Sequence, residues 1–294
     1  MTSSLSSSRT AALLALVAVT AIWGSTFLVV KNAIARAPVM DFLAVRFAVA
    51  SVVMFALRPQ CLRGMNRRSA LRGVGLGVAL AAGYVTQTFG LLTASPSVSA
   101  FITGTFVVFT PVISWLVLRR RVDRNAWLGV ALAFVGLALL SLRGWSQGPG
   151  ELLTLACAVF FAVHIVGLGE WAPGESAYGL AFIQIATVAA VSLVVAAPGG
   201  FRMPAEFDVW GAVAITAVLA TALAFFIQTW AQSLLAPTLA AVVMTMEPVF
   251  AGIFGVSLGG DRLTLRVVGG AVCILAAMLL VQLGQKRDVE RSSA

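Results

Sequence analysis

Long apolar segments follow one another along this 294-residue chain. A helix needs about 20 consecutive apolar residues to cross the hydrocarbon core of a bilayer, and the segments approach that length. Polar residues, proline or glycine separate ten of them: 11–32, 41–57, 71–92, 97–118, 126–142, 151–169, 177–197, 209–232, 237–258 and 264–283. Most connections are very short and leave no room for a soluble domain. We therefore expect an all-α polytopic membrane protein with ten transmembrane helices.

The composition excludes other classes. The chain is 60% hydrophobic and only 11% charged, and a soluble domain of this length would need far more polar surface. The apolar segments are continuous rather than alternating, which excludes a strand barrel. The net charge of +9 does not predict nucleic-acid binding, because the basic residues cluster in short loops as juxtamembrane anchors do. The first apolar run continues to Val30, so we expect an uncleaved first span.

Positive charge predicts the orientation. Thirteen of the 20 Lys and Arg residues fall in segments that share a side with the N-terminus, and six fall on the other side. Because cytoplasmic loops carry the excess of positive charge, both termini should be cytoplasmic. We therefore expect a multi-pass membrane protein with both termini on one side.

An internal repeat divides the chain into 1–144 and 145–294, with five predicted spans each. Gln87-Thr88-Phe89 of the third span returns as Gln228-Thr229-Trp230 of the eighth. The two prolines deep in helices, Pro111 and Pro248, are each followed by Val, in the fourth and ninth spans. Because each half has an odd number of spans, the halves should lie in the membrane in opposite orientation. Inverted repeats around a central cavity are typical of secondary transporters.

Glu247 is the only acid deep within a predicted span. A charge there costs a few kcal/mol unless it is protonated, paired or facing water, so a functional role is the default hypothesis. Glu247 could bind a substrate ammonium or carry a proton. It could equally pair with Arg46, or cap backbone groups that Pro248 frees by lacking an N–H. The sequence does not favour the functional role of Glu247 over the structural one.

Arg46 and His164 are the other candidate polar groups within spans. Arg46 could meet a substrate carboxylate, but bridging between helices is favoured and we treat it as a structural charge. His164 could relay protons, since its charge changes near physiological pH. A lone histidine on an apolar helix is more often hydrogen-bonded to a neighbour.

Polar and aromatic residues recur at helical spacing on several spans, and lipid would disfavour such faces. We predict that these residues line a cavity for amphipathic solutes, with interhelical hydrogen bonding as the alternative for about half of the polar ones. The predicted lining residues are Trp23, Thr26, Tyr84, Gln87, Thr103, Phe106, His164, Gln228 and Glu247. Kinks at Pro111 and Pro248 are predicted to permit the bending that opens or seals the cavity.

Several motifs resemble the EamA-type transporters of the drug/metabolite transporter superfamily. They are Trp23-Gly24-Ser25-Thr26-Phe27 and Arg46-Phe47 in the first half, and Gln228-Thr229-Trp230-Ala231-Gln232, Pro237-Thr238, Glu247-Pro248-Val249-Phe250-Ala251, Gly260-Asp261-Arg262-Leu263-Thr264 and Gly269-Gly270 in the second. The resemblance covers essentially the whole chain. Length and organisation are similar to the YddG-type amino-acid exporters of the bacterial inner membrane, which implies outward movement of amino acids and related metabolites. The family often has Gly-Glu at Gly260-Asp261, whose first-half counterpart is Arg121, so that loop receives no role.

The favoured function is a secondary transporter that exports neutral amino acids, aromatic ones included, and related small metabolites by alternating access. The alternative is a multidrug or organic-cation exporter of the same superfamily, which would need Glu247 in the cavity. A membrane-embedded enzyme is not expected, because the chain has one histidine and no deep aspartate. No Walker motif, cofactor or metal site is predicted. The expected partners are the small-molecule substrate and the bilayer, and one subunit can enclose the site.

Overall fold

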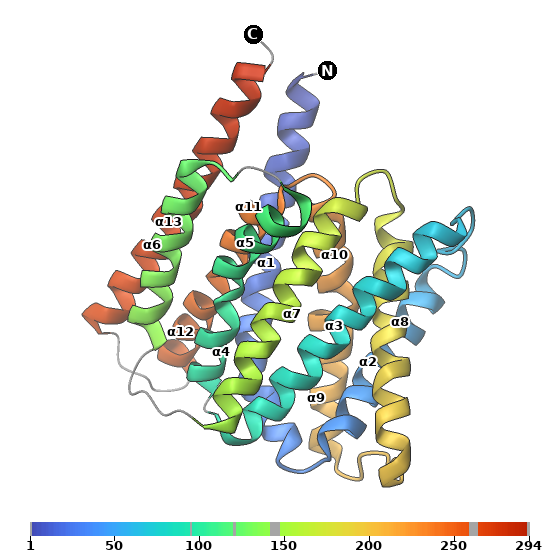
Figure 1. Cartoon of the computed structure of the whole chain (residues 1–294). Helices are drawn as coiled ribbons and strands as arrows, with labels where there is room; N and C mark the ends of the chain where they lie inside the picture. The colour runs from blue at the N-terminus through green and yellow to red at the C-terminus, as the bar shows by residue number, and fades with distance from the viewer. Residues whose placement is uncertain (1, 95, 120–121, 142–147, 259–263, 293–294) are drawn as a thin grey trace.

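The computed structural model describes residues 2–94, 96–119, 122–141, 148–258 and 264–292, and every regular element among them is helical (Figure 1). Lipid offers no hydrogen-bond partner to the backbone, so an apolar chain crosses it as helices whose N–H and C=O groups bond internally. The first-half helices are α1 (Thr2–Ile34), α2 (Val39–Leu57), α3 (Arg67–Thr93), α4 (Pro96–Gly104), α5 (Phe106–Leu118) and α6 (Arg124–Ser141).

The second-half helices are α7 (Pro149–Trp171), α8 (Ala177–Ala196), the short 3₁₀ turn η1 (Ala197–Gly199), α9 (Phe207–Ala217), the π-helix η2 (Val218–Leu223), α10 (Ala224–Gln232), α11 (Pro237–Met244), α12 (Met246–Leu258) and α13 (Leu265–Ser292). The predicted boundary between the halves, and the loop residues Arg121, Gly260 and Asp261, lie outside the described residues.

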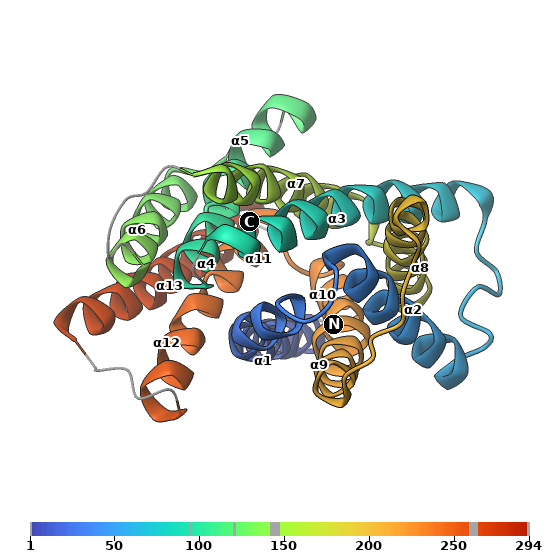
Figure 2. The same ribbon diagram turned by 90° about the horizontal axis from the view of Figure 1, so that it is seen from below.

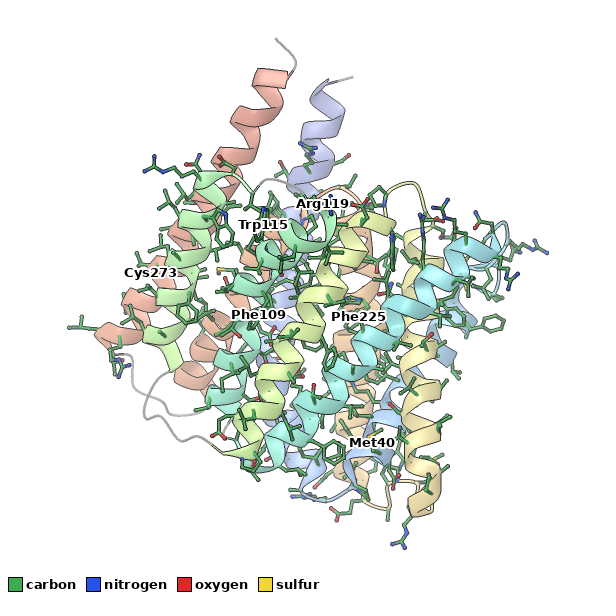
Figure 3. The ribbon with its side chains drawn as sticks, viewed as in Figure 1. Met40, Phe109, Trp115, Arg119, Phe225 and Cys273 are labelled. Atoms are coloured by element: carbon green, nitrogen blue, oxygen red, sulfur yellow. The ribbon has the colours of Figure 1, made fainter. Side chains whose placement is uncertain are left out.

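Seven helical segments of the described chain are long and apolar enough to cross a membrane. They are Ser7–Ile34, Val39–Leu57, Arg67–Thr93, Val98–Leu118, Pro149–Trp171, Ala177–Gly199 and Phe207–Gln232. Three shorter apolar helices span Arg124–Leu139, Pro237–Phe250 and Val268–Val281. Large apolar side chains cover the outer faces, as Trp115 on α5 does with 57% of its surface exposed (Figure 3). The chain is a polytopic helical membrane protein.

The helices of the two halves are intermixed rather than segregated (Figures 1 and 2). Helix α3 packs along α7 and α8, α2 packs against α8 and α9, and α6 pairs with α13. Helix α1 contacts α10 and α12. A cavity enclosed by such a bundle must therefore be lined from both halves.

Glycines allow two of these helix pairs to approach closely. A Cβ on Gly77 of α3 would lie 2.9 Å from the carbonyl oxygen of Gln184 on α8. A Cβ on Gly136 of α6 would lie 2.8 Å from the carbonyl oxygen of Gly270 on α13. Helix backbones come this close only where no side chain stands between them. The close approach increases the van der Waals contact that holds helices together in a membrane.

Ion pairs join the halves at both ends of the bundle. Arg36, just after α1, contacts Asp208 at 2.8 Å and Glu206 at 3.3 Å. The hydrogen bond to Asp208 raises the pKa of the exposed Arg36 guanidinium. At the other end, Arg72 of α3 lies 3.6 Å from Glu175, which follows α7. These contacts are solvent-accessible, so each stabilises the fold only slightly.

Two predicted spans are interrupted by one residue each, and a third contains a π-helix; the sequence predicted kinks at Pro111 and Pro248 but not these positions. The span 97–118 breaks at Thr105 and the span 237–258 breaks at Thr245. At each break the threonine hydroxyl donates to a carbonyl three residues earlier, Ile102 at 2.5 Å and Val242 at 2.6 Å. This local bond competes with the regular helical pattern. The span 209–232 is continuous but contains the π-helix η2.

Candidate functional site: a polar cavity lined by both halves

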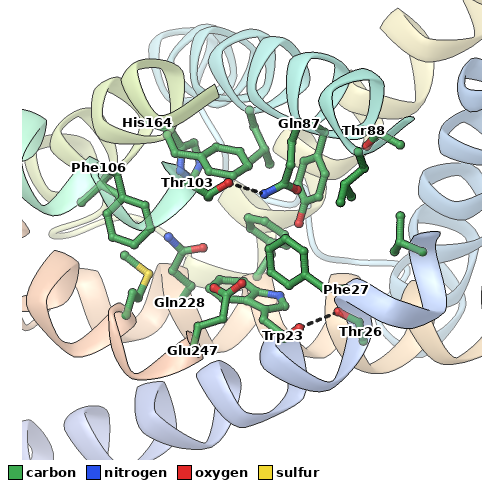
Figure 4. Close-up of a pocket in the computed structure, with 18 of the residues that line it drawn as sticks. Trp23, Thr26, Phe27, Gln87, Thr88, Thr103, Phe106, His164, Gln228 and Glu247 are labelled. Atoms are coloured by element: carbon green, nitrogen blue, oxygen red, sulfur yellow. Dashed lines mark hydrogen bonds between the residues drawn. The ribbon is translucent and has the colours of Figure 1, made fainter. Parts of the chain in front are cut away.

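A cavity of about 70 Å³ lies inside the bundle, with room for a few water molecules (Figure 4). Its wall is built from α1, α2, α3, α4 and α5 of the first half and from α7, α10, α11 and α12 of the second. All nine residues predicted as lining belong to this wall, and so does Arg46. Their role in binding stays a prediction.

The wall also holds Phe27 and Thr88, which share helix faces with predicted lining residues, as the helical spacing predicts. Seven further wall residues were not predicted: Val30, Leu80, Leu91, Phe161, Ile165, Phe225 and Met244. Most are apolar residues on apolar helices, where sequence alone does not distinguish a cavity face from a lipid face. Phe225 had one available signal, because it lies 141 positions after Tyr84 (84 to 225).

Ten of the 19 lining residues fall in five pairs with this same spacing. The pairs are 23 and 164, 84 and 225, 87 and 228, 103 and 244, and 106 and 247. Residues in corresponding places of a repeat occupy corresponding places in its fold. Their chemistry has diverged, since only the pair Gln87 and Gln228 is identical. The two sides of the cavity therefore offer different groups to a solute.

Aromatic rings form much of the wall. The ring of Phe225 lies 5.6 Å from that of Trp23 and 6.0 Å from that of Tyr84, measured between centroids. Phe161 lies 5.5 Å from Tyr84 in an edge-to-face contact. Such contacts stabilise a rigid apolar surface. It suits an apolar or aromatic side chain of a small solute.

Arg46 is held on the first-half side and is 4% exposed. Its Nε donates to the hydroxyl of Thr221 on η2 at 2.9 Å. Its guanidinium lies 5.1 Å from the ring centroid of Tyr84 and 5.2 Å from that of Phe47, within the range of a cation–π interaction. Because Thr221 and Arg46 come from different halves, this geometry supports the helix-bridging interpretation.

The π-helix η2 receives a second bond from the first half. The indole Nε1 of Trp23 donates to the carbonyl oxygen of Ala220 at 2.8 Å. A π turn leaves carbonyl groups that an α-helix would use, and such turns are frequent at functional sites. Trp23 and Arg46 thus both bind the same six-residue segment. Sequence reasoning did not find η2, because a widened turn leaves composition unchanged.

Glu247 is in the first turn of α12 and lines the cavity. Within the described residues its carboxylate makes neither a hydrogen bond nor an ion pair with another side chain. The alternative in which Glu247 pairs with Arg46 is therefore absent from this structure. A carboxylate placed so, in a cavity large enough for water, is available to a solute.

His164 is 1% exposed, and its Nε2 lies 2.6 Å from Oε1 of Gln184. Nε2 of Gln184 donates to the carbonyl oxygen of Leu180 at 3.0 Å. A backbone carbonyl can only accept, so this bond fixes the orientation of the Gln184 amide and leaves its Oε1 as acceptor. Nε2 of His164 must then carry the hydrogen, a tautomer assigned from the network. The neighbour-bonded interpretation of His164 fits this arrangement.

The other predicted polar residues divide between free and satisfied groups. Nε2 of Gln87 donates to the Thr103 hydroxyl at 3.2 Å. The Thr26 hydroxyl donates to the carbonyl oxygen of Trp23 on its own helix at 2.8 Å. Gln228 keeps one amide oxygen without a partner among the described residues. The structure describes no group of three or more His, Cys, Asp and Glu that could hold a metal ion.

The two predicted gating prolines differ in their relation to the helix breaks. Pro248 is the third residue of α12, and the carbonyl that it cannot bond belongs to Met244, the last residue of α11. The hydrogen bond that Pro248 cannot make would therefore span the break at Thr245. Pro111 lies inside α5, and the break at Thr105 precedes it by more than a turn. In this span the helix break therefore lies at Thr105 and not at Pro111.

Comparison with known proteins identifies the family. Residues 10–142 and 148–283 each match the EamA-like transporter family. The chain belongs to this family. It is 36% identical over 275 residues to an uncharacterized transporter of Archaeoglobus fulgidus, covering 92% of this chain and 84% of that protein. It is 26% identical to YedA, an uncharacterized inner membrane transporter of Escherichia coli K12, over 92% of this chain and 90% of that protein.

A solved crystal structure has the same fold, with a TM-score of 0.76 at 18% identity, covering 95% of this chain and 99% of the other. The predicted membership of the EamA-type transporters of the drug/metabolite transporter superfamily is confirmed. Because the chain belongs to a transporter family and these relatives are named transporters, the cavity is that of a membrane transporter.

Proposed function

We propose that this EamA-like transporter is a secondary transporter that exports amino acids and related small metabolites by alternating access. One observation carries the proposal: a single cavity is lined by one carboxylate, Glu247, one guanidinium, Arg46, and several aromatic rings. An amino acid at neutral pH has an ammonium, a carboxylate and a side chain. Glu247 attracts the ammonium and the rings accept the side chain. The Arg46 guanidinium, although its direct partner is Thr221, adds a positive charge that favours the carboxylate of the solute electrostatically.

We further propose that the ten spans form two inverted five-helix repeats, 1–144 and 145–294. The paired spacing of the lining residues supports this, since a repeat predicts it. The mutual packing of α6 with α13, and of α2 with both α8 and α9, is of the kind expected when the halves exchange places about an axis in the membrane plane.

Transport then proceeds by rocking of one half against the other around the cavity. The helix breaks at Thr105 and Thr245, beside the two prolines, supply places where α4 and α5, and α11 and α12, can change their mutual angle. The ion pair of Arg36 with Asp208 and that of Arg72 with Glu175 would alternately open at the two ends.

We place the protein in the inner membrane of a bacterial cell, with both termini in the cytoplasm. The distribution of Lys and Arg supports the orientation. YedA is named an inner membrane transporter, which supports the location. Labelling of single cysteines introduced at Ser8 and Ser292 tests the orientation, and opposite accessibility of the two sites would contradict it.

The alternative function is export of organic cations or drugs. The free carboxylate of Glu247 in the cavity favours it, because a cationic solute needs an anion and no guanidinium. The two functions differ in the carboxylate of the substrate. If the positive charge of Arg46 attracts the substrate carboxylate, amino acids should be transported better than the corresponding amines. If the cavity is built for organic cations, the amines should be transported better.

Counterflow in liposomes tests both proposals. Purified full-length protein is preloaded with unlabelled solute, and uptake of radiolabelled amino acids, amines and sugars is followed at several pH values. We expect counterflow of neutral amino acids and none of sugars. Counterflow of amines alone would replace the first function with the second, and exchange of neither would overturn both.

A further inference from the structure

Two glutamines on one face of α10 form a relay that ends at the cavity. Nε2 of Gln232 donates to the backbone carbonyl oxygen of Ile165 on α7 at 2.9 Å. Nε2 of Gln228 donates to Oε1 of Gln232 at 3.0 Å. Both side chains are almost completely buried, with exposures of 3% for Gln228 and 1% for Gln232. Gln228 lines the cavity, and Gln232 lies behind it.

The relay fixes which way each amide faces. The Ile165 carbonyl can only accept, so Gln232 must present its NH₂ group to it and keep its oxygen for Gln228. Gln228 must in turn present its NH₂ group to that oxygen. Oε1 of Gln228 is left over, and within the described residues it is buried without a hydrogen-bond partner. An unpaired buried acceptor of this kind costs about 1 to 3 kcal/mol.

Gln228 and Glu247 lie on the side of the pocket opposite Gln87 and Thr88 (Figure 4). An ionised carboxylate has only acceptor atoms, and the free atom of Gln228 is also an acceptor. No donor among the described side chains meets either group. The corresponding amide of the first half, Gln87, is engaged differently, because it donates to the hydroxyl of Thr103.

We propose that Oε1 of Gln228 and the carboxylate of Glu247 form a subsite for a primary ammonium group, and that Gln232 is the positioning residue that keeps the Gln228 oxygen turned to the substrate. The inference rests on the proposed function in that the ammonium belongs to the exported solute. A primary ammonium supplies N–H donors to both acceptors at once. A quaternary ammonium has the same charge but no N–H, so charge attraction alone does not satisfy Gln228.

Binding to the purified full-length protein in nanodiscs tests this without transport. The probes are phenethylamine and its N,N,N-trimethyl derivative, which share the aromatic ring and the charge. We expect the primary amine to bind at least about tenfold more tightly, the effect of losing one charge-assisted hydrogen bond. Equal binding, or no binding of phenethylamine, overturns the subsite. This comparison uses the wild-type chain and does not depend on any variant folding.

Variants separate the two glutamines. Gln228→Leu removes the oxygen, and the preference for the primary amine should fall to within about threefold. Gln232→Leu leaves Gln228 in place but frees its amide to rotate, so the preference should fall as well although no cavity-lining residue has changed. Gln87→Leu is the matched control from the other half, and should weaken both probes alike and so keep their ratio. An unchanged ratio in Gln232→Leu would remove the positioning role.

The failure of this inference is distinguishable from the failure of the proposed function. If amino acids undergo counterflow but the two amines bind equally, the transporter function stands and the subsite is wrong. If phenethylamine is preferred but no amino acid undergoes counterflow, the subsite stands and the substrate class becomes the organic amines.

Discussion

Arg46 on α2 and Glu247 on α12 are the charged residues of the cavity wall, and they are held in opposite ways. Arg46 has a hydrogen bond to Thr221 and two aromatic rings within cation–π distance. Glu247 has no such partner among the described residues. A charge that the protein itself satisfies holds the fold together, whereas one left unsatisfied is free to act on a solute. The difference assigns structure to one side of the cavity and recognition to the other.

Neutralising Glu247 should have the largest effect on transport. In Glu247→Gln we expect counterflow of cationic or zwitterionic solutes to fall by about thirtyfold or more, because truncating a buried charge pair costs roughly 2 kcal/mol or more. The thermal unfolding midpoint in detergent should be unchanged or raised, since an unpaired charge has been removed.

The control for this variant is Glu206→Gln, the same exchange at an exposed acid next to α9. Its counterflow should match the wild type. Full transport by Glu247→Gln would show that the carboxylate does not bind the solute and would count against the organic-cation function.

Replacing Arg46 should have its main effect on stability. Arg46→Met removes a cation–π contact and a hydrogen bond, worth together about 2 to 3 kcal/mol for a desolvated site. The unfolding midpoint should fall, and Arg46→Lys should recover part of it. Lost transport with an unchanged midpoint would instead make Arg46 a substrate ligand and erase the contrast with Glu247.

The two prolines test whether the Glu247 side moves. Pro248→Ala restores a backbone donor toward Met244, next to the break before α12, and should slow counterflow several-fold while changing solute affinity less. Pro111→Ala should have a smaller effect, because its break at Thr105 is more distant. Unchanged rates in both variants would remove the prolines from gating.

The indole of Trp23 tests the structural side more finely. Trp23→Phe keeps a ring against Phe225 but loses the bond to the Ala220 carbonyl, which should cost about 1 kcal/mol in unfolding free energy. Combined with Arg46→Met, the losses should not simply add, because both side chains bind η2. A double-variant cycle of unfolding midpoints measures the coupling, and strict additivity would separate the two contacts.

The smallest effect is expected at an exposed cation. Arg36→Gln breaks the pairs with Asp208 and Glu206, which solvent and salt already weaken. Its unfolding midpoint should lie close to the wild type and should lose its small difference at high ionic strength. A loss as large as that of Arg46→Met would show that burial does not account for the importance of Arg46.

The sequence predicted the polar side of this site well because polar groups in apolar helices are rare and costly. Glu247, Arg46, His164 and the two repeat glutamines, Gln87 and Gln228, could be found from that principle alone, and all five line the cavity. Their partners could not be predicted. Thr221 is 175 positions from Arg46, and a threonine in an apolar helix carries no signal of its distant contact.

The sequence predicted kinks at Pro111 and Pro248 but did not place the breaks at Thr105 and Thr245. Thr105 and Thr245 break their spans with a hydroxyl bond that threonine makes equally in unbroken helices, so the residue type alone does not indicate a break. Phe161 and Phe225 were missed for a different reason. An aromatic ring is as compatible with lipid as with a cavity, and only packing decides between them.

The widened turn at η2 sets the rotational phase of everything that follows it in α10. A π turn accommodates about one residue more than an α turn. If 218–223 were wound as a regular α-helix with no residue removed, the segment 224–232 would rotate by about 100° about its axis. Gln228 and Phe225 would then no longer face the cavity. The residues that the cavity presents to a solute thus depend on how the segment 218–223 is wound, although none of its own side chains lines the cavity.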